Sequence, residues 1–168
     1  MSEESPTHPR VVVLVCGNPS RGDDALGPTL ARRVEAWAER HPERSLDVVE
    51  DFQFQIEHAL DLQGRDLAIF IDATVDAPTP ITFTRLVPAA SVSLSTHALS
   101  PAAVLQAFET IDGGAPPLAY TLAVRGARFE LGEGLSPEAT ANLDAAWTLL
   151  ERLLDHPSAH RWNAETSP

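Results

Sequence analysis

The chain has few of the residues that mark several large classes of protein. One cysteine in 168 residues excludes an internal disulfide and fits a reducing compartment. Only 12 basic residues accompany 24 acidic ones, and the resulting net charge of -12 would repel the phosphates of nucleic acid. No apolar run reaches the about eighteen residues that span a membrane, and the polar start does not resemble a signal peptide. We therefore expect a cytoplasmic protein with no nucleic-acid or membrane partner.

Several catalytic signatures are also missing. The sequence has no Walker loop, no G-x-G-x-x-G, no H-E-x-x-H and no G-x-S-x-G nucleophile elbow. Cys16 ends an apolar run, so we interpret it as a buried apolar side chain and not as a nucleophile. No serine or cysteine nucleophile is therefore indicated.

The sequence does contain a regular alternation of strand and helix patterns. Short runs that are apolar or rich in β-branched residues predict five strands, at 11–16, 46–50, 67–72, 81–87 and 118–125. Helical spacing of apolar residues and two Ser-Pro helix starts predict helices at 28–40, 100–111 and 136–154, with a shorter helix at 55–62. This order predicts a three-layer α/β/α fold on a mixed, mainly parallel five-stranded sheet with one antiparallel strand.

The connections predict how the chain is organised. About eight residues separate the third and fourth strands, too few for a crossover helix, so we expect these two strands to form an antiparallel pair. Residues 10–154 are expected to form a single α/β domain, because no internal spacer divides them. Residues 1–9 are predicted to be a flexible N-terminus. Residues 155–168, which lose all periodicity, are predicted to be a mobile tail.

Individual side chains are assigned from the same patterns. Trp37 and Trp147 fall on helix faces and are predicted to be core, whereas Trp162 in the tail has no assigned role. His58 shows no partner pattern and is treated as a surface residue. In the short helix at 55–62, three side chains are expected to point inward, Ile56, Ala59 and Leu60.

The strand-to-helix turn within residues 11–27 is the most informative segment. The apolar run leads directly into Gly17-Asn18-Pro19, which the adjacent acids Asp23 and Asp24 follow. Two neighbouring carboxylates in such a turn are costly unless something uses their charge. In an α/β sheet this turn lies at the carboxyl ends of the strands, where these folds bind their ligands. We therefore interpret the turn as a binding loop.

Two further residues could join this loop in a metal site. Asp72 closes a second buried run, and parallel strands would bring it to the same edge of the sheet as Asp24. His97 lies just before the helix that Ser100 opens, in a loop that can reach this edge. One imidazole and two carboxylates suit a divalent transition ion with open positions for water or substrate. Spacing alone leaves an alternative, in which the Asp only caps a turn and the His is solvated.

Together these residues resemble the signature of the [NiFe] hydrogenase maturation endopeptidases. Asn18, Asp24 and Gly27 fall on its Asn, acidic and helix-opening Gly positions, while Asp72 and His97 match its Asp and His in order and context. The resemblance implies that Asp24, Asp72 and His97 are the metal-contacting and catalytic residues. It also implies an endopeptidase that removes the C-terminal extension of a [NiFe] hydrogenase large-subunit precursor after nickel insertion. The nickel would be supplied by this precursor, the expected partner, and not held by the free enzyme.

Two positions depart from the pattern of that family. Many relatives have Gly-X-Gly-Asn where this chain has Val15-Cys16-Gly17-Asn18, and many have Glu where it has Asp24. Asp23 is therefore a rival to Asp24 as the metal ligand, although Asp24 keeps the six-residue offset from Asn18. If Asp23 instead faces the start of a helix, the helix dipole would stabilise its charge.

The segment after the second strand, Asp51–Glu57, is the predicted recognition segment. The resemblance places subgroup-specific residues here, and primary amides such as those of Gln53 and Gln55 can bond an extended peptide backbone. With Asn18, these two are the predicted substrate-binding residues. In the alternative, both glutamines are solvated and three apolar side chains are core, Phe52, Phe54 and Ile56.

Two other functions fit parts of the pattern. A small-molecule hydrolase on a similar sheet would need an enclosed pocket and, for an anionic substrate, more cationic residues near the binding loop than Arg21. A non-catalytic hydrogenase assembly chaperone would bind a metalloprotein C-terminus without cutting it, so only turnover would distinguish it from a peptidase. For a peptidase, a shared cation could polarise the scissile carbonyl or activate water, or a carboxylate could act as the base.

Overall fold

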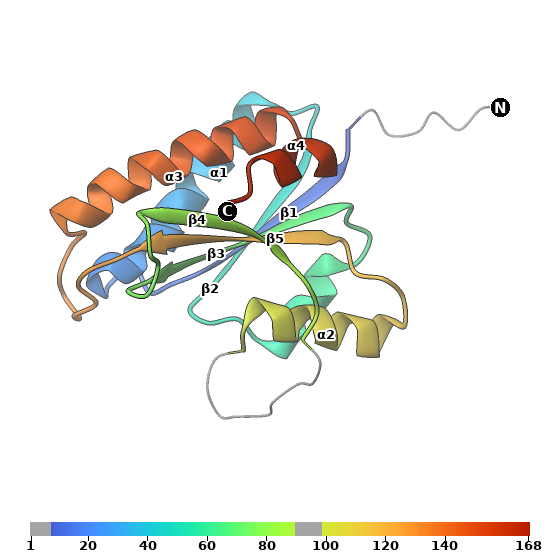
Figure 1. Cartoon of the computed structure of the whole chain (residues 1–168), viewed down its shortest axis with the longest axis horizontal. Coiled ribbons are helices and arrows are strands. Elements are labelled where there is room, and N and C mark those ends of the chain that lie inside the picture. Colours follow the sequence, from blue (N-terminus) through green and yellow to red (C-terminus); the bar gives the residue numbers. More distant parts are fainter. Residues whose placement is uncertain (1–7, 90–98) are drawn as a thin grey trace.

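The computed structural model describes residues 8–89 and 99–168 and contains a five-stranded sheet (Figure 1). The strand order is β2-β1-β3-β5-β4. β1, β2, β3 and β5 run parallel, and β4 is antiparallel to β5. The predicted fold class is therefore confirmed. The bounds of the strands are β1 (Arg10–Cys16), β2 (Ser45–Asp51), β3 (Leu67–Thr74), β4 (Ile81–Leu86) and β5 (Leu118–Arg125).

The predicted pairing of the third and fourth strands is wrong. β5 lies between them and pairs with β3 in parallel, in register from Leu67–Leu118 to Thr74–Arg125, and with β4 in antiparallel orientation. The connection 75–80 therefore bridges two strand spacings, about 10 Å, which six extended residues easily span. A short connection excludes a crossover helix, but it does not require the two strands to be neighbours.

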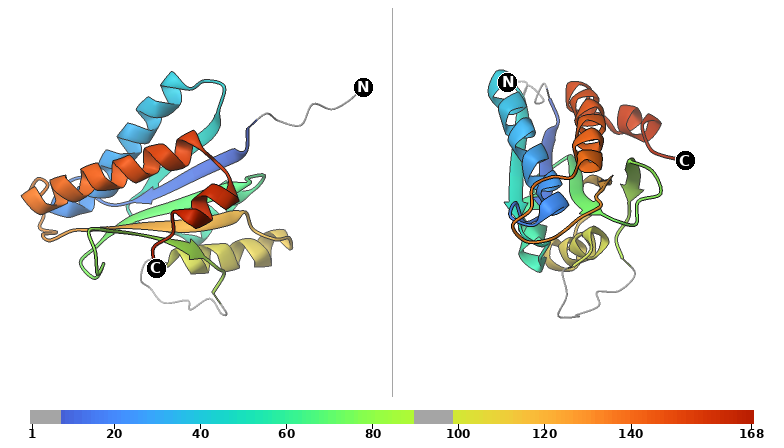
Figure 2. Two further views of the ribbon diagram at one scale, coloured as in Figure 1. Left: turned by 45° about the horizontal axis from the view of Figure 1, so that its top comes forward. Right: turned by 90° about the vertical axis from the view of Figure 1, so that its left-hand side faces the viewer.

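Helices cover both faces of the sheet (Figures 1 and 2). The bounds of the helices on one face are α1 (Leu26–Arg40), α3 (Pro137–Asp155) and the short α4 (Ala159–Ala164). The other face is covered by α2 (Pro101–Asp112) and the 3₁₀ helix η2 (Ile56–Leu62). Both predicted Ser-Pro starts are confirmed, because the hydroxyl oxygens of Ser100 and Ser136 accept the backbone N–H three residues later, at 3.2 and 3.1 Å.

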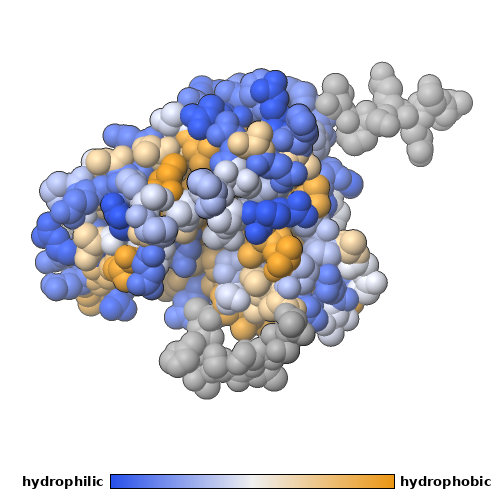
Figure 3. All heavy atoms as spheres, viewed as in Figure 1, coloured by the Kyte–Doolittle hydropathy of each residue, from blue (hydrophilic) through white to orange (hydrophobic). Residues whose placement is uncertain are grey.

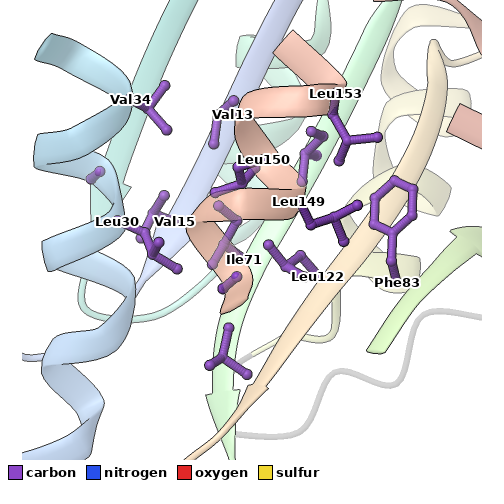
Figure 4. Packing of buried hydrophobic residues seen from close by; sticks show 14 of the residues in the cluster. Val13, Val15, Leu30, Val34, Ile71, Phe83, Leu122, Leu149, Leu150 and Leu153 are labelled. Atoms are coloured by element: carbon purple, nitrogen blue, oxygen red, sulfur yellow. The ribbon is translucent and has the colours of Figure 1, made fainter. Parts of the chain in front are cut away.

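Each face of the sheet has its own hydrophobic core, and β1 contributes to both. Successive side chains of a strand point to opposite faces, so alternate residues of 11–16 pack toward α1 and α3 or toward α2 and η2. In the first core, Leu30 and Val34 of α1 and the leucines of α3 meet over the sheet (Figure 4). Trp37 is buried and Trp147 packs against this core, as predicted.

The short helix after β2 is oriented differently from the prediction. Ala59 is buried, but Ile56 and Leu60 are 39% and 55% exposed. An α-helical period would put all three side chains on one face. η2 is a 3₁₀ helix that repeats every three residues, so Leu62 and not Leu60 joins Ala59 on the buried side. The exposure of Ile56, the first residue of η2, is not explained by this repeat. The prediction is therefore confirmed for Ala59 and wrong for Ile56 and Leu60.

The segment predicted as a mobile tail packs onto the sheet. It forms α4, whose Trp162 is fully buried and meets the ring of Tyr120 edge to face, with centroids 5.4 Å apart. Beyond the helix, the hydroxyl of Ser167 accepts the N–H of Phe83 at 3.0 Å, and its own N–H donates to the Phe83 carbonyl at 2.7 Å. A helix of six residues is too short to show periodicity, so the sequence pattern could not reveal it.

The outer surface agrees with the charged composition. The face of the molecule in Figure 3 is mostly hydrophilic, with hydrophobic residues in small separate patches. In the described part of the chain, no helix combines the length and hydrophobicity needed to cross a bilayer. Three of the large apolar side chains that stay exposed belong to the loops after β2, β3 and β5, namely Phe52, Val75 and Leu131.

Candidate active site

The carboxyl ends of the four parallel strands meet at one edge of the sheet, which faces the viewer in the right panel of Figure 2. The loop after β1 includes the short 3₁₀ helix η1 (Gly22–Ala25) and leads into α1. It lies beside the loop 126–136 that follows β5. The predicted binding loop is therefore at the edge where α/β sheets bind their ligands.

The backbone of Asn18 fixes the side chain of Asp24. The Asn18 N–H donates to Asp24 Oδ2 at 2.7 Å, which accounts for the six-residue offset between the two residues. The side-chain Oδ1 of Asn18 accepts the N–H of Ser20 at 2.9 Å, and its carbonyl accepts the N–H of Arg21 at 3.1 Å. These bonds close the loop on itself and hold a partly exposed Asp24 at the edge. Substrate binding by Asn18 stays a prediction.

Two glycines let α1 approach the end of β1. A Cβ atom at Gly17 would lie 2.2 Å from the carbonyl oxygen of Asp24. One at Gly27 would lie 2.5 Å from the carbonyl oxygen of Cys16. Both separations are far inside contact distance, so neither position can carry a side chain unless the backbone shifts. The glycines therefore set how closely the Asp24 loop is held to the sheet.

Asp72 lies in β3, one residue beyond the paired residues Val15 and Ile71. Burial raises the pKa of the Asp72 carboxyl, and the negative charge of Asp24 raises it further. Hydrogen bonding to the Cys16 thiol and to the backbone of the next residue partly offsets this rise in pKa. Asp24 belongs to η1, whose residues contact β3, and its bond to Asn18 holds it after the end of β1. The structure thus places Asp24 and Asp72 at the same carboxyl edge.

His97, the third predicted metal ligand, lies outside the described residues. Across 8–89 and 99–168, no three His, Cys, Asp or Glu side chains are arranged to hold a metal ion. The carboxylates of Asp24 and Asp72 are nevertheless of a chemical type that divalent cations bind. The complete ligand set of Asp24, Asp72 and His97 stays a prediction.

Cys16 is buried at the end of β1, as predicted. Burial raises the pKa of its thiol, and the nearby carboxylates of Asp72, Asp24 and Asp51 raise it further. The thiol is therefore protonated at neutral pH and is a poor nucleophile. Its surroundings also show that three carboxylates gather around the end of β1.

Asp23, the rival ligand, is not available to a metal. Its side chain is fully buried, with Oδ1 accepting the N–H of Ser136 at 2.7 Å and Oδ2 accepting the N–H of Ala127 at 2.7 Å. Ser136 is the N-cap of α3, so Asp23 faces the start of that helix and not of α1. Asp24 is therefore the carboxylate of the pair that faces the edge.

A histidine that the sequence patterns missed organises the loop after β2. His58 was predicted at the surface but is buried, and this prediction is wrong. Its Nδ1 accepts the N–H of Gln55 at 2.8 Å, which leaves the ring proton of the neutral form on Nε2, 3.4 Å from Oδ2 of Asp51. The spacing of Gln55 and His58 was a detectable signal, because these residues occupy the first and fourth positions of a capping box at the start of the predicted helix.

The predicted recognition residues divide into two groups. Gln53 is exposed beside the site, whereas the side chain of Gln55 caps η2 by accepting the backbone N–H of His58. Of the three aromatic and aliphatic residues offered as core in the alternative, only Phe54 is buried. Neither the recognition hypothesis nor its alternative therefore describes the whole segment, and substrate binding by Gln53 and Gln55 stays a prediction.

Comparison with solved structures connects this fold to one group of proteins. The chain is similar to the [NiFe] hydrogenase maturation protease HycI from Thermococcus kodakarensis KOD1, with a TM-score of 0.65 and 21% identity over 88% of this chain and 93% of that one. It is similar to the hydrogenase maturating endopeptidase HybD from E. coli, with a TM-score of 0.64 and 24% identity over 87% of this chain and 93% of that one.

A hydrogenase 2 maturation peptidase from a Thaumarchaeota archaeon gives a TM-score of 0.60 and 20% identity, over 87% of this chain and 98% of that one. No family model and no curated protein matches the sequence. The chain therefore has the fold of solved hydrogenase maturation proteases, as the resemblance in its sequence implied.

Proposed function

We propose that the protein is an endopeptidase that removes the C-terminal extension of a [NiFe] hydrogenase large-subunit precursor after nickel insertion. One observation supports the proposal: Asp24, in the turn after β1, and Asp72, in β3, are at the same carboxyl edge of a fold shared with solved hydrogenase maturation proteases. The likeness supports the architecture, and the paired carboxylates supply the chemistry. Asp23 cannot take this role, because its oxygens are bonded within the protein.

The nickel of the precursor is treated as part of the substrate. Asp24, Asp72 and His97 are the residues that would contact it. A divalent cation there would supply Lewis acidity toward the scissile carbonyl or an attacking water. A carboxylate that the cation leaves free would act as the base that accepts a proton from that water.

The surroundings of the site bear on the choice between a protein substrate and a small molecule. Three loops at this edge each leave a large apolar side chain exposed, Phe52, Val75 and Leu131, which a protein substrate would cover on binding. A small-molecule hydrolase would instead need an enclosed pocket. The single cysteine supports a cytoplasmic location for this activity.

Incubation with nickel-loaded and nickel-free precursor, followed by mass measurement of the products, tests the proposal. We expect a C-terminal peptide to be lost from the nickel-loaded precursor alone. Asp72→Asn and His97→Ala should each abolish this loss while the protein remains folded. Binding of the precursor with no change in mass would support the assembly chaperone instead. Efficient processing of nickel-free precursor by metal-stripped enzyme would refute the nickel dependence.

A further inference from the structure

The two loops at the carboxyl edge are joined by backbone hydrogen bonds. The N–H of Gly22 donates to the carbonyl of Glu133 at 3.0 Å, and the N–H of Gly132 donates to the carbonyl of Ser20 at 2.7 Å. Their contact is visible in the right panel of Figure 2, where the start of α1 and the chain leading into α3 lie side by side. The position of the Asp24 loop therefore depends on residues more than 100 positions later in the chain.

Asp23 lies at the centre of this contact. Besides the N–H groups of Ala127 and Ser136, its carboxylate accepts the N–H of Arg128 at 3.0 Å and the hydroxyl of Ser136 at 2.8 Å. Its own N–H donates to the Arg128 carbonyl at 2.6 Å. The buried carboxylate thus accepts four hydrogen bonds from within the protein.

The geometry of η1 couples this carboxylate to its neighbour. Successive side chains of a 3₁₀ helix point about 120° apart, so when Asp23 points into the protein, Asp24 must point elsewhere. The direction it takes leads to the N–H of Asn18, on the side of the loop where η1 contacts β3. Gly126 leaves little freedom, because a Cβ atom there would lie 2.9 Å from the Cβ of Asp23.

We propose that Asp23 is a positioning residue that holds Asp24 in place beside Asp72. Asp23 itself touches no substrate, since its side chain is fully buried. An Asn at this position would turn an amide N–H₂ toward groups that are themselves donors, and a longer Glu would meet the tight packing against Gly126. The consequence for cleavage rests on the proposed peptidase function, but the effect on the geometry of Asp24 does not.

The amide proton of Asn18 reports directly on Asp24, because its short hydrogen bond to that carboxylate shifts its NMR signal downfield. In Asp24→Asn, the reference variant, the downfield shift should be reduced by loss of the charge. In Asp23→Asn it should change in the same direction although Asp24 is intact. Tyr120→Phe is the control for stability alone, because it removes a 2.6 Å bond to Asn163 in another part of the fold and should leave the Asn18 signal unchanged.

Cleavage kinetics of the same variants complete the test. In Asp23→Asn we expect kcat on nickel-loaded precursor to fall about 10- to 100-fold with little change in KM, because a misplaced catalytic group slows the chemical step. Should Asp23→Asn fail to fold, Ser136→Ala removes one bond to the carboxylate and should give a smaller change of the same kind. An unchanged Asn18 signal in folded variants at both positions overturns the positioning role. Wild-type protein that never cleaves the precursor would contradict the peptidase function alone, because the NMR result would still stand.

Discussion

Asp72 is a carboxyl group that the fold keeps in an unfavourable place. Burial and the charge of Asp24 raise its pKa, so its ionised form is less stable in the folded protein than in the unfolded chain. Functional sites often hold such groups at a cost in stability. Asp66 shows the opposite case, because hydrogen bonds from the backbone and side chain of Arg10 lower its pKa.

Asp72→Asn should therefore raise the melting temperature at pH 7. The destabilising effect of Asp72 is absent below its unfolded-state pKa of about 3.9 and grows as the pH rises toward the folded-state pKa. The gain should thus shrink as the pH falls and vanish below about pH 4. Melting curves between pH 3 and pH 8 measure it.

Asp66→Asn is the matched control with the opposite sign. Its lowered pKa stabilises the folded state above the unfolded-state pKa, and that stability is lost as the pH falls through the folded-state pKa. This variant should melt below the wild type at pH 7, by a small amount because the group is exposed. Equal melting temperatures of Asp72→Asn and the wild type at pH 7 would show that Asp72 is not unfavourably placed.

Gly17→Ala should destabilise the protein, because the added Cβ would lie 2.2 Å from the Asp24 carbonyl oxygen. We expect a loss of about 1–3 kcal/mol in unfolding free energy, or a melting temperature lower by roughly 3–10 °C. Gly134→Ala is the control, because a Cβ there meets nothing within 4 Å. Thermal melts of both variants give the comparison, and a Gly17 variant as stable as the control would contradict the close packing of this loop.

The predicted ends of the strands were enough to place Asp24 and Asp72 at the same edge of the sheet, because parallel strands bring their carboxyl ends together. The role of Asp23 could not be found in this way. Its partners Ala127 and Ser136 are 104 and 113 residues away, so no local spacing links them to it. His58 was missed for a related reason, since its partner Asp51 ends a strand and His58 lies in the next helix, so no single period relates the two residues.

At the level of elements, the segment after β2 gives one prediction about substrate recognition and one about stability. Gln53→Ala should reduce precursor cleavage without lowering the melting temperature, because that side chain is exposed. If its amide bonds the substrate backbone, the variant should lose about 1–3 kcal/mol of transition-state binding free energy, measured as a lower kcat/KM. Gln55→Ala should instead lower the melting temperature slightly, because its side chain caps η2. Parallel kinetics and melting curves separate the two effects, and unaltered turnover in the Gln53 variant would remove its recognition role.

The α4 element makes a second prediction. Trp162→Ala should lower the free energy of unfolding by about 3–5 kcal/mol, because it empties a fully buried site against Tyr120. Trp162→Phe keeps a ring but loses the 2.9 Å bond from Nε1 to the carbonyl of Leu153, so it should cost less. Urea titrations measure both. A truly mobile tail would leave the unfolding midpoint unchanged in either variant.

At the scale of the whole molecule, local patterns predicted the elements better than their order in space. The observed starts and ends of the strands agree with the predicted ones within two residues, because buried strands are continuous apolar runs that polar residues and turns interrupt. After α2, the chain returns to the sheet as β5 and inserts between β3 and β4. This position depends on packing between segments that are distant in the sequence, so the pattern within one segment does not predict it. The position of α4 also depends on tertiary packing. Its buried residue is Trp162, so the helix has no periodic apolar face that the sequence could reveal.

The contact between Ser167 and Phe83 also covers backbone groups at one border of the sheet. β4 forms one border of the sheet, and an unpaired border can recruit a strand from another molecule. Ser167 occupies both backbone groups of Phe83 that such a strand would need. The opposite border, β2, carries the charged side chains of Asp47 and Glu50, which form ion pairs with Arg65 and Arg32, and charged residues on a border strand disfavour the addition of another strand. Ser167 thus covers part of one border of the sheet in addition to following a packed helix.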